Sequence, residues 1–164
     1  MTWFLLGLVR VLTGAQARWQ GCPPKAEQRI YFANHQSHAD LVMVWAALPQ
    51  ELRTITRPIA AKDYWTQTPF KQWLTTAVFN AVYVERERKG DEDPLQPLVD
   101  ALESGDSIIL FPEGTRGFTG EPQVFKAGLY NLAKRFPDVV LVPAWINNIQ
   151  RMLPKGEVIP VPVL

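Results

Sequence analysis

Both histidines of this chain stand within a few residues of one aspartate. His35, His38 and Asp40 lie in the segment "NHQSHAD", and the chain of 164 residues has no other histidine. Histidine titrates near neutral pH, and a carboxylate that holds its ring makes it a better general base. His35 and Asp40 are five residues apart, so on a regular helix they would not share a face. We expect them to meet only if His35 precedes a helix, which Ser37 could cap, and Asp40 lies in its first turns.

The same residues allow two other interpretations. His38 is an alternative partner for Asp40, being two residues away. Two histidines and one carboxylate are also a ligand set for a metal-dependent hydrolase or oxygenase, which would lose activity with a chelator. The metal hypothesis leaves a second polar segment unexplained, so we favour the general base and expect no metal.

The second polar segment spans residues 111–128, "FPEGTRGFTGEPQVFKAG". Gly114 would let backbone amides approach a ligand closely, and Arg116 offers a planar fork for a phosphate. Arg86 and Lys126 could add positive charge. The segment predicts a phosphate site, and the alternative is a turn with a surface ion pair of little energetic value.

Strands and helices alternate along the chain. The apolar pattern predicts strands at 29–33, 54–61, 81–85, 107–111 and 139–146, with a possible sixth in 157–164, and helices at 40–48, 63–78, 94–105 and 127–136. This alternation predicts a single α/β domain with a mostly parallel central sheet flanked by helices. Pro58 interrupts the second strand, which indicates an edge strand or a bend.

The polar segments follow three of these predicted strands. "NHQSHAD" follows the first strand, Arg86 the third and "PEGTR" the fourth. Functional groups of open α/β sheets gather beyond the carboxyl ends of the strands. We therefore expect these side chains to form one site.

Composition narrows the function classes. Apolar residues make up 47% of the chain, charged residues 20%, and the formal net charge is +1. These values indicate a folded domain and exclude a polyelectrolyte binder, so no nucleic acid partner is expected. Cys22 is the one cysteine, so the chain cannot form an internal disulfide.

Residues 1–19 have the pattern of an amphipathic helix. Polar or small residues recur at spacings of three and four, and apolar residues fill the remaining positions. The segment is too short and interrupted to span a bilayer, and Arg10 within the apolar run argues against a secretory signal. Residues 1–29 hold four basic residues and one acidic residue, which would attract an anionic leaflet. We expect a membrane-interface helix at 1–19 before a domain at 20–164; the alternative is a helix packed on that domain.

Together, these motifs resemble those of the glycerolipid acyltransferase family, of which bacterial lysophosphatidic acid acyltransferases are typical members. The signature is His-x-x-x-x-Asp at His35–Asp40, a block "FNAVYVER" ending at Arg86, then "FPEGTR", then "VLVPAWI" with Pro143. The order, spacing and all four blocks agree over residues 30–146.

The resemblance implies a mechanism and a site. His35 would deprotonate a glycerol hydroxyl, Asp40 would orient His35, and the alkoxide would attack an acyl thioester without an acyl-enzyme, metal or other cofactor. The residues implied to bind the acceptor are Arg86, Glu113, Gly114, Thr115, Arg116 and Lys126. His38 falls on a variable position of the motif and is left out of the catalytic set.

The resemblance also implies partners and a location. The donor would be acyl-CoA or an acyl carrier protein (acyl-ACP), and the acceptor a lysophospholipid, with 1-acylglycerol-3-phosphate giving phosphatidic acid. The partner surface would be a lipid membrane, at the cytoplasmic face of the inner membrane.

Two features depart from the family pattern. Asn80 or Ala81 stands where the second block often has glycine, so the acceptor pocket could differ. The chain ends at Leu164, where members usually continue with a further strand and helices, which suggests a C-terminally truncated domain. The truncation leaves open a non-catalytic, lipid-binding descendant of the fold.

Overall fold

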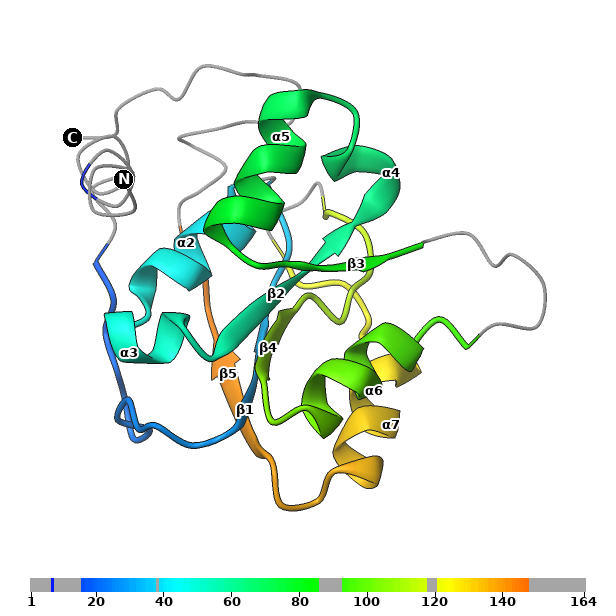
Figure 1. Ribbon diagram of the computed structural model, residues 1–164. Coiled ribbons are helices and arrows are strands. Elements are labelled where there is room, and N and C mark those ends of the chain that lie inside the picture. Colours follow the sequence, from blue (N-terminus) through cyan, green and yellow to red (C-terminus); the bar gives the residue numbers. More distant parts are fainter. Residues whose placement is uncertain (1–6, 8–15, 38, 86–92, 118–120, 148–164) are drawn as a thin grey trace.

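Five parallel strands form the central sheet of the computed structural model, which describes residues 7, 16–37, 39–85, 93–117 and 121–147 (Figure 1). Within these residues the strand order is β3-β2-β4-β1-β5. The strands are β1 (Arg29–Ala33), β2 (Thr56–Ala61), β3 (Val82–Val84), β4 (Ser107–Leu110) and β5 (Val140–Ala144). Every neighbouring pair runs parallel, which confirms the predicted α/β class.

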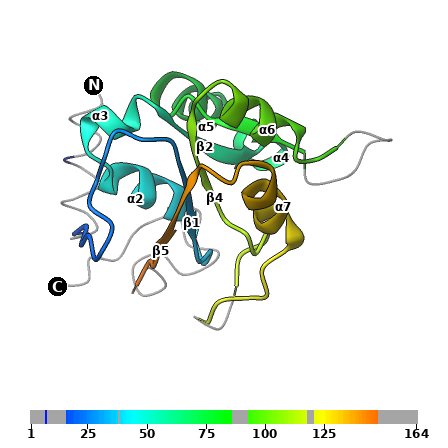
Figure 2. The ribbon, with the colours of Figure 1, turned by 90° about the horizontal axis from the view of Figure 1, so that it is seen from below.

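Helices cover both faces of the sheet. They are α2 (Asp40–Ala47), α3 (Gln50–Arg53), α4 (Lys62–Trp65), α5 (Pro69–Trp73), the π-helix η1 (Leu74–Val78), α6 (Gln96–Glu103) and α7 (Ala127–Arg135). Figure 2 shows α2 on one side of β1 and α7 on the other. This two-sided cover is typical of parallel sheets, whose strands are accordingly apolar on both faces.

The alternation of side chains along β1 divides the core into two clusters. Tyr31 and Ala33 pack with residues of α2, whereas Ile30 and Phe32 pack with residues of α6 and α7. Successive side chains of a strand point to opposite faces, so one five-residue strand contributes to both clusters. Buried on both sides, β1 is a rigid base for the segment that follows it.

Pro58 was predicted to mark an edge strand or a bend, and the edge strand was wrong. β2 lies inside the sheet, between β3 and β4. It pairs with β4 through Thr56–Pro58 and with β3 through Ile59–Ala61. Proline cannot donate a ladder hydrogen bond, and here it stands where the pairing passes from one neighbour to the other.

The prediction of one continuous helix over 63–78 was also wrong. The segment contains the end of α4, a break, and then α5 running into η1. Thr68 starts the second helix, because its side chain accepts a hydrogen bond from the Lys71 amide and Pro69 occupies the first turn. Proline and a hydroxyl cap favour a new helix start at this point.

Asn80 is one of the two residues that stand where the family pattern often has glycine. Its φ is 49°, in the left-handed region, and its carbonyl accepts a hydrogen bond from Arg57 Nε at 3.0 Å. Glycine adopts this conformation freely, and asparagine is among the few other residues that tolerate it. Asn80 can therefore replace glycine here while keeping the turn before β3.

Several predictions fall outside the described residues. The helix expected at 1–19 is described only at Gly7 and residues 16–19, and the strand expected within 157–164 is not described. The proposed division at residues 19 and 20 therefore stays a prediction. Within the part of the chain that is described, no helix combines the length and apolar character needed to cross a bilayer.

Candidate active site

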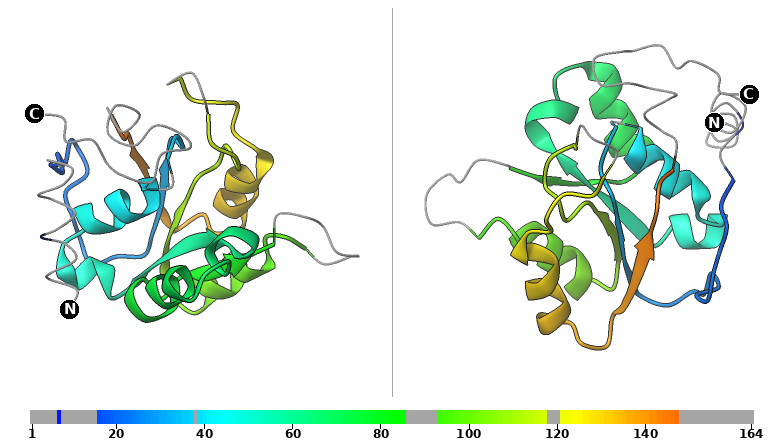
Figure 3. Two further views of the ribbon diagram at one scale, coloured as in Figure 1. Left: turned by 90° about the horizontal axis from the view of Figure 1, so that it is seen from above. Right: turned by 180° about the vertical axis from the view of Figure 1, so that it is seen from behind.

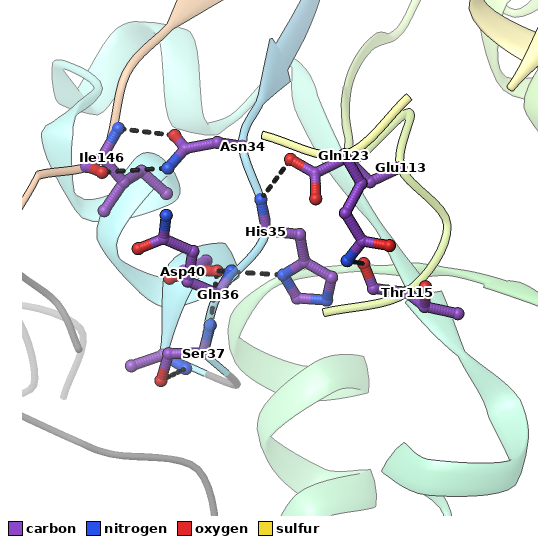
Figure 4. A network of polar contacts seen from close by, with 10 residues as sticks. Asn34, His35, Gln36, Ser37, Asp40, Glu113, Thr115, Gln123 and Ile146 are labelled. Carbon is purple, nitrogen blue, oxygen red and sulfur yellow. Dashed lines mark hydrogen bonds and ion pairs between the residues drawn. The ribbon is translucent and has the colours of Figure 1, made fainter. Parts of the chain in front are cut away.

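The segment after β1 is tied to the neighbouring strand before it reaches His35. The Asn34 side chain donates to the Ile146 carbonyl at 3.0 Å and accepts from the Ile146 amide at 2.8 Å (Figure 4). Asn34 is buried, so this pair of bonds satisfies polar groups that would otherwise be costly to bury. The carboxyl ends of β1 and β5 are thereby held together, which sets the direction in which His35 leaves the sheet.

His35 and Asp40 meet in the one arrangement that their spacing allowed. His35 Nδ1 lies 2.9 Å from Asp40 Oδ2, with His35 on the loop before α2 and Asp40 in the first turn of that helix (Figure 4). A carboxylate only accepts, so Nδ1 carries the proton in this bond, which in the neutral ring leaves the lone pair on Nε2. This is the tautomer that a general base requires.

Asp40 is held in place by the backbone of its own loop. Its Oδ2 also accepts from the amides of Gln36 at 2.6 Å and Ser37 at 2.8 Å, and the residue is fully buried. Three donors therefore converge on one oxygen, which fixes the carboxylate against rotation. The His35 side chain keeps 21% of its surface exposed, so its ring remains accessible.

The predicted cap of α2 by Ser37 was wrong. Ala39 is the N-cap residue and makes no side-chain capping bond. The Ser37 hydroxyl instead accepts from the Ala39 amide at 3.2 Å, and the Ser37 carbonyl accepts from the Asp40 amide at 3.3 Å. The serine therefore shapes the loop, since serine hydroxyls often bond the backbone two residues ahead.

The loop after β4 hydrogen-bonds both the amide and the carbonyl of His35. Glu113 Oε1 accepts from the His35 amide at 3.1 Å, and the Gly117 amide donates to the His35 carbonyl at 2.8 Å. The Phe111 ring stacks on the imidazole with centroids 4.3 Å apart and an interplanar angle of 20°. His35 is therefore positioned by two loops that are about seventy residues apart in the sequence.

Glu113 is a buried charged residue of the second motif. Only 3% of the residue is exposed, and its Oε2 has no hydrogen-bond partner in the described part of the chain. The contact that the structure gives it is the amide of His35. Its predicted contact with the acceptor stays a prediction.

Gly114 makes room for a lysine beside the second motif. Its φ is 72°, and a Cβ placed on it would lie 2.7 Å from Lys126 Nζ. The Lys126 amide donates to the Pro112 carbonyl at 2.9 Å, which folds the later part of the loop back onto the turn. Thr115 and Lys126 are exposed and Arg116 is half-buried. The turn thus joins an open backbone to positive charge, as a phosphate site requires.

The structure unites most of the predicted site residues on these two loops. The contacts above link His35 to Asp40 and to Glu113, and Gly114 lies beside Lys126. Thr115 and Arg116 lie on the same loop as Gly114. Arg86 and His38 lie outside the described residues. Within the described ranges no three His, Cys, Asp or Glu side chains gather as metal ligands. Because His38 is not among them, the metal hypothesis stays untested.

The sequence analysis missed three residues that hold His35 or the chain next to it in place. Asn34, Phe111 and Gly117 received no role, although each stands beside a residue of the two motifs or a few positions from one. Adjacency to a motif was the available signal. Their partners could not be read from the sequence. Ile146 is far from Asn34 in the chain, and His35 is far from Phe111 and Gly117.

Comparison with known proteins places this geometry in a family. Residues 20–147 match the Acyltransferase family, which is most of the chain. The chain belongs to the acyltransferase family. The resemblance found in its motifs is thereby confirmed.

Curated relatives of this acyltransferase-family chain have related names. Human 1-acyl-sn-glycerol-3-phosphate acyltransferase alpha is 28% identical over 155 residues, covering 91% of this chain and 52% of the relative. The Helicobacter pylori 1-acyl-sn-glycerol-3-phosphate acyltransferase is 28% identical over 123 residues, covering 74% of this chain and 50% of the relative. The chain spans about half the length of these relatives.

A solved structure supports the fold of this acyltransferase-family domain. The 1-acyl-sn-glycerophosphate (LPA) acyltransferase PlsC from Thermotoga maritima superposes with a TM-score of 0.69 and 22% sequence identity. The match covers 95% of this chain and 63% of the solved chain. The two chains therefore share the α/β arrangement described above.

Proposed function

We propose that this chain transfers a fatty acyl group from an acyl thioester to the hydroxyl of a lysophospholipid. The acceptor is 1-acylglycerol-3-phosphate and the product phosphatidic acid. The observation that carries the proposal is the His35–Asp40 pair at 2.9 Å, with a partly exposed imidazole beside a cationic turn. The names of the relatives support the same substrates.

His35 acts as the general base. Nε2 takes the proton of the acceptor hydroxyl, and the resulting alkoxide oxygen attacks the thioester carbonyl carbon. The C–S bond of the tetrahedral intermediate then breaks, and the departing thiolate takes the proton back from the imidazolium. Asp40 stabilises the imidazolium through Oδ2 while charge develops on the ring. No acyl-enzyme and no metal take part.

The acceptor phosphate binds at the second loop. Arg116 and Lys126, together with Arg86, supply the positive charge, and the backbone near Gly114 and Thr115 supplies close approach. Glu113 supports this arrangement indirectly, because its buried Oε1 holds the His35 amide. The hydroxyl to be acylated thus lies between a fixed phosphate and a fixed base.

The acyl donor is acyl-CoA or acyl-ACP, and the enzyme works at a membrane. A lysophospholipid and a long acyl chain both reside at a bilayer surface. The amphipathic pattern of residues 1–19 would bring the domain to the cytoplasmic face of the inner membrane.

Thiol release from a long-chain acyl thioester tests the proposal directly. The full chain is assayed in vesicles with acyl-CoA or acyl-ACP, with and without 1-acylglycerol-3-phosphate, and phosphatidic acid is followed by mass spectrometry. Release should depend on the acceptor. His35→Ala should lower kcat by about a thousandfold or more, because a positioned base and its partner act as one unit.

His38→Ala is the matched control for this experiment. The general-base mechanism predicts near wild-type release for His38→Ala and no effect of a chelator. The metal hypothesis predicts that both histidine variants and the chelator abolish activity. Equal loss in both variants would therefore contradict the proposed mechanism.

A folded wild-type chain that binds lysophospholipid vesicles but releases no thiol with either donor or with other lysophospholipids would reject the enzymatic proposal. The lipid-binding module without catalysis would then account for the fold.

A further inference from the structure

Three exposed apolar side chains stand at the same end of the sheet as His35. Val124 is 90% exposed, Phe125 45% and Trp145 61%. The first two belong to the second loop, and Trp145 directly follows β5. In the left view of Figure 3 the described parts of this loop (yellow) and the ends of β1 (blue) and β5 (orange) reach the same side of the molecule.

Packing and strand register put Phe125 and Trp145 on one face. The rings of Phe125 and Phe32 pack edge to face, with their centroids 6.2 Å apart. Phe32 is paired in register with Pro143 on β5, and Trp145 lies two residues beyond that proline. Side chains two residues apart share a face of a strand. Phe125 therefore lies on the α7 side of the sheet with Phe32. The alternation of β5 continues past Ala144, because Val142 and Ile146 both pack in the cluster on the α2 side. Trp145 therefore lies on the α7 side, and Val124 precedes Phe125 in the chain.

Positive charge accompanies this apolar group. Lys126 is exposed next to Phe125, and Arg116 is half-buried in the same loop. Among the described residues of this loop, Glu121 is the exposed carboxylate, since Glu113 is buried against His35. Exposed apolar and aromatic side chains with adjacent cations match an anionic lipid surface, where tryptophan is favoured at the interface.

We propose that Val124, Phe125 and Trp145, here called the apolar lip, insert into the surface of an anionic bilayer while Arg116 and Lys126 lie at its headgroups. The inference rests on the proposed function in one respect: the acceptor is drawn from that bilayer. The lip then holds the two loops of the site at the depth of the acceptor phosphate. The acceptor hydroxyl reaches His35 without the lipid having to cross water.

Leu141 is an exposed apolar residue outside the lip and provides a control position. It is 40% exposed on β5, four residues before Trp145, which follows the strand on the same side. At the rise of a strand this is about 13 Å from Trp145. A polypeptide docked along β5 would cover both side chains, whereas a lipid plane that meets the lip would cover Trp145 alone.

Vesicle co-sedimentation tests the lip without any catalytic step. The full chain is mixed with phosphatidylcholine vesicles, with or without phosphatidylglycerol, at low and high salt and without acyl donor. Val124→Asp and Trp145→Asp are each expected to weaken partition to anionic vesicles by about tenfold, while Leu141→Asp changes it less than about twofold. Thermal unfolding of each variant checks that the fold is intact. Any contribution of residues 1–19 is common to all the chains, so the ratios report on the lip.

The outcomes separate the lip from the proposed function. Wild-type binding that prefers anionic vesicles, lost in the two lip variants and kept in Leu141→Asp, supports the lip whether or not thioester is consumed. Equal loss in Leu141→Asp would show that the effect on partition is not specific to the lip and would overturn it. Unchanged partition in both lip variants would also overturn it. So would a loss of self-association in Val124→Asp by sedimentation velocity without a change in partition, since the partner would then be a second copy.

Discussion

The two loops that build the site differ in how they are held. The loop after β1 is mostly buried, and its amides converge on Asp40 within a few residues. The loop after β4 is mostly exposed and carries Arg116 and Lys126 toward solvent. A proton transfer needs atoms fixed to within a few tenths of an ångström, whereas a phosphate needs accessible charge. The difference indicates a division between a loop for chemistry and a loop for binding.

The division is not complete, because the second loop also holds the first. Glu113 and Gly117 bond the amide and carbonyl of His35, and Phe111 stacks on its ring. The buried start of the second loop therefore belongs functionally with the first loop, and its exposed remainder belongs with the substrate. Substitutions at Asp40, Glu113 and Arg116 test this division between the two loops.

The largest of these effects is expected at Asp40, in the loop for chemistry. In Asp40→Asn, the carboxamide oxygen can still accept from Nδ1 and the two loop amides, but it carries no charge to stabilise the imidazolium that forms when His35 takes the proton. We expect kcat to fall by about a hundredfold or more, with little change in the KM for the acceptor. Steady-state kinetics with varied acceptor gives both values.

Circular dichroism must accompany this measurement, because Asp40 Oδ2 also anchors two loop amides. A folded Asp40→Asn variant with wild-type kcat and a raised KM would show that the first loop serves binding, which contradicts the division.

An intermediate effect is expected at Glu113, where the two loops meet. Glu113→Ala leaves the His35 amide without its acceptor, and we expect kcat to fall by about ten- to a hundredfold because the base is less well positioned. Glu113→Gln keeps a carbonyl oxygen for the amide and should restore most of kcat. The acceptor KM should change little in either variant.

Glu121→Ala, in the exposed part of the same loop, is the matched control and should leave kcat near wild type. If Glu113→Ala instead raises KM with kcat preserved, Glu113 contacts the acceptor as the motif alone implied.

The smallest effect is expected at Arg116, in the loop for binding. Arg116→Gln removes one cation from a half-exposed site, where solvent screens part of its attraction for phosphate. We expect the acceptor KM to rise by about fivefold with kcat nearly unchanged, an effect of about 1 kcal/mol. Acceptor titrations at low and high salt measure it, since screening should reduce the difference.

Arg135→Gln controls for the loss of charge alone, because Arg135 on α7 pairs with Glu103 on α6 at 2.8 Å. A larger loss of kcat than of acceptor affinity in Arg116→Gln would assign Arg116 to the chemistry and remove the contrast between the loops.

The local sequence pattern was sufficient to predict most helices and strands and the contact between His35 and Asp40. Arg29–Ala33 was predicted with the observed bounds, since an apolar strand between turns is readable from neighbours in the chain. The approach of His35 to Asp40 was also predictable, because a short loop joins His35 to the first turn of the helix that begins at Asp40. Pro58 and the break before Pro69 were misjudged for a common reason. A proline shows which donor is missing, but whether a strand or helix tolerates that loss depends on its neighbours.

The sequence by itself determined the class of fold, the chemistry of its two motifs and the family. These follow from residue types and short spacings, which bonded neighbours express locally. Only the tertiary structure decided that Glu113 and Gly117 clamp His35, that Asn34 binds Ile146, and that Phe125 and Trp145 share a face. Those relations depend on the strand order β3-β2-β4-β1-β5, which joins distant segments. Strand order is set by the packing of the whole sheet and its helices, and no local pattern encodes it.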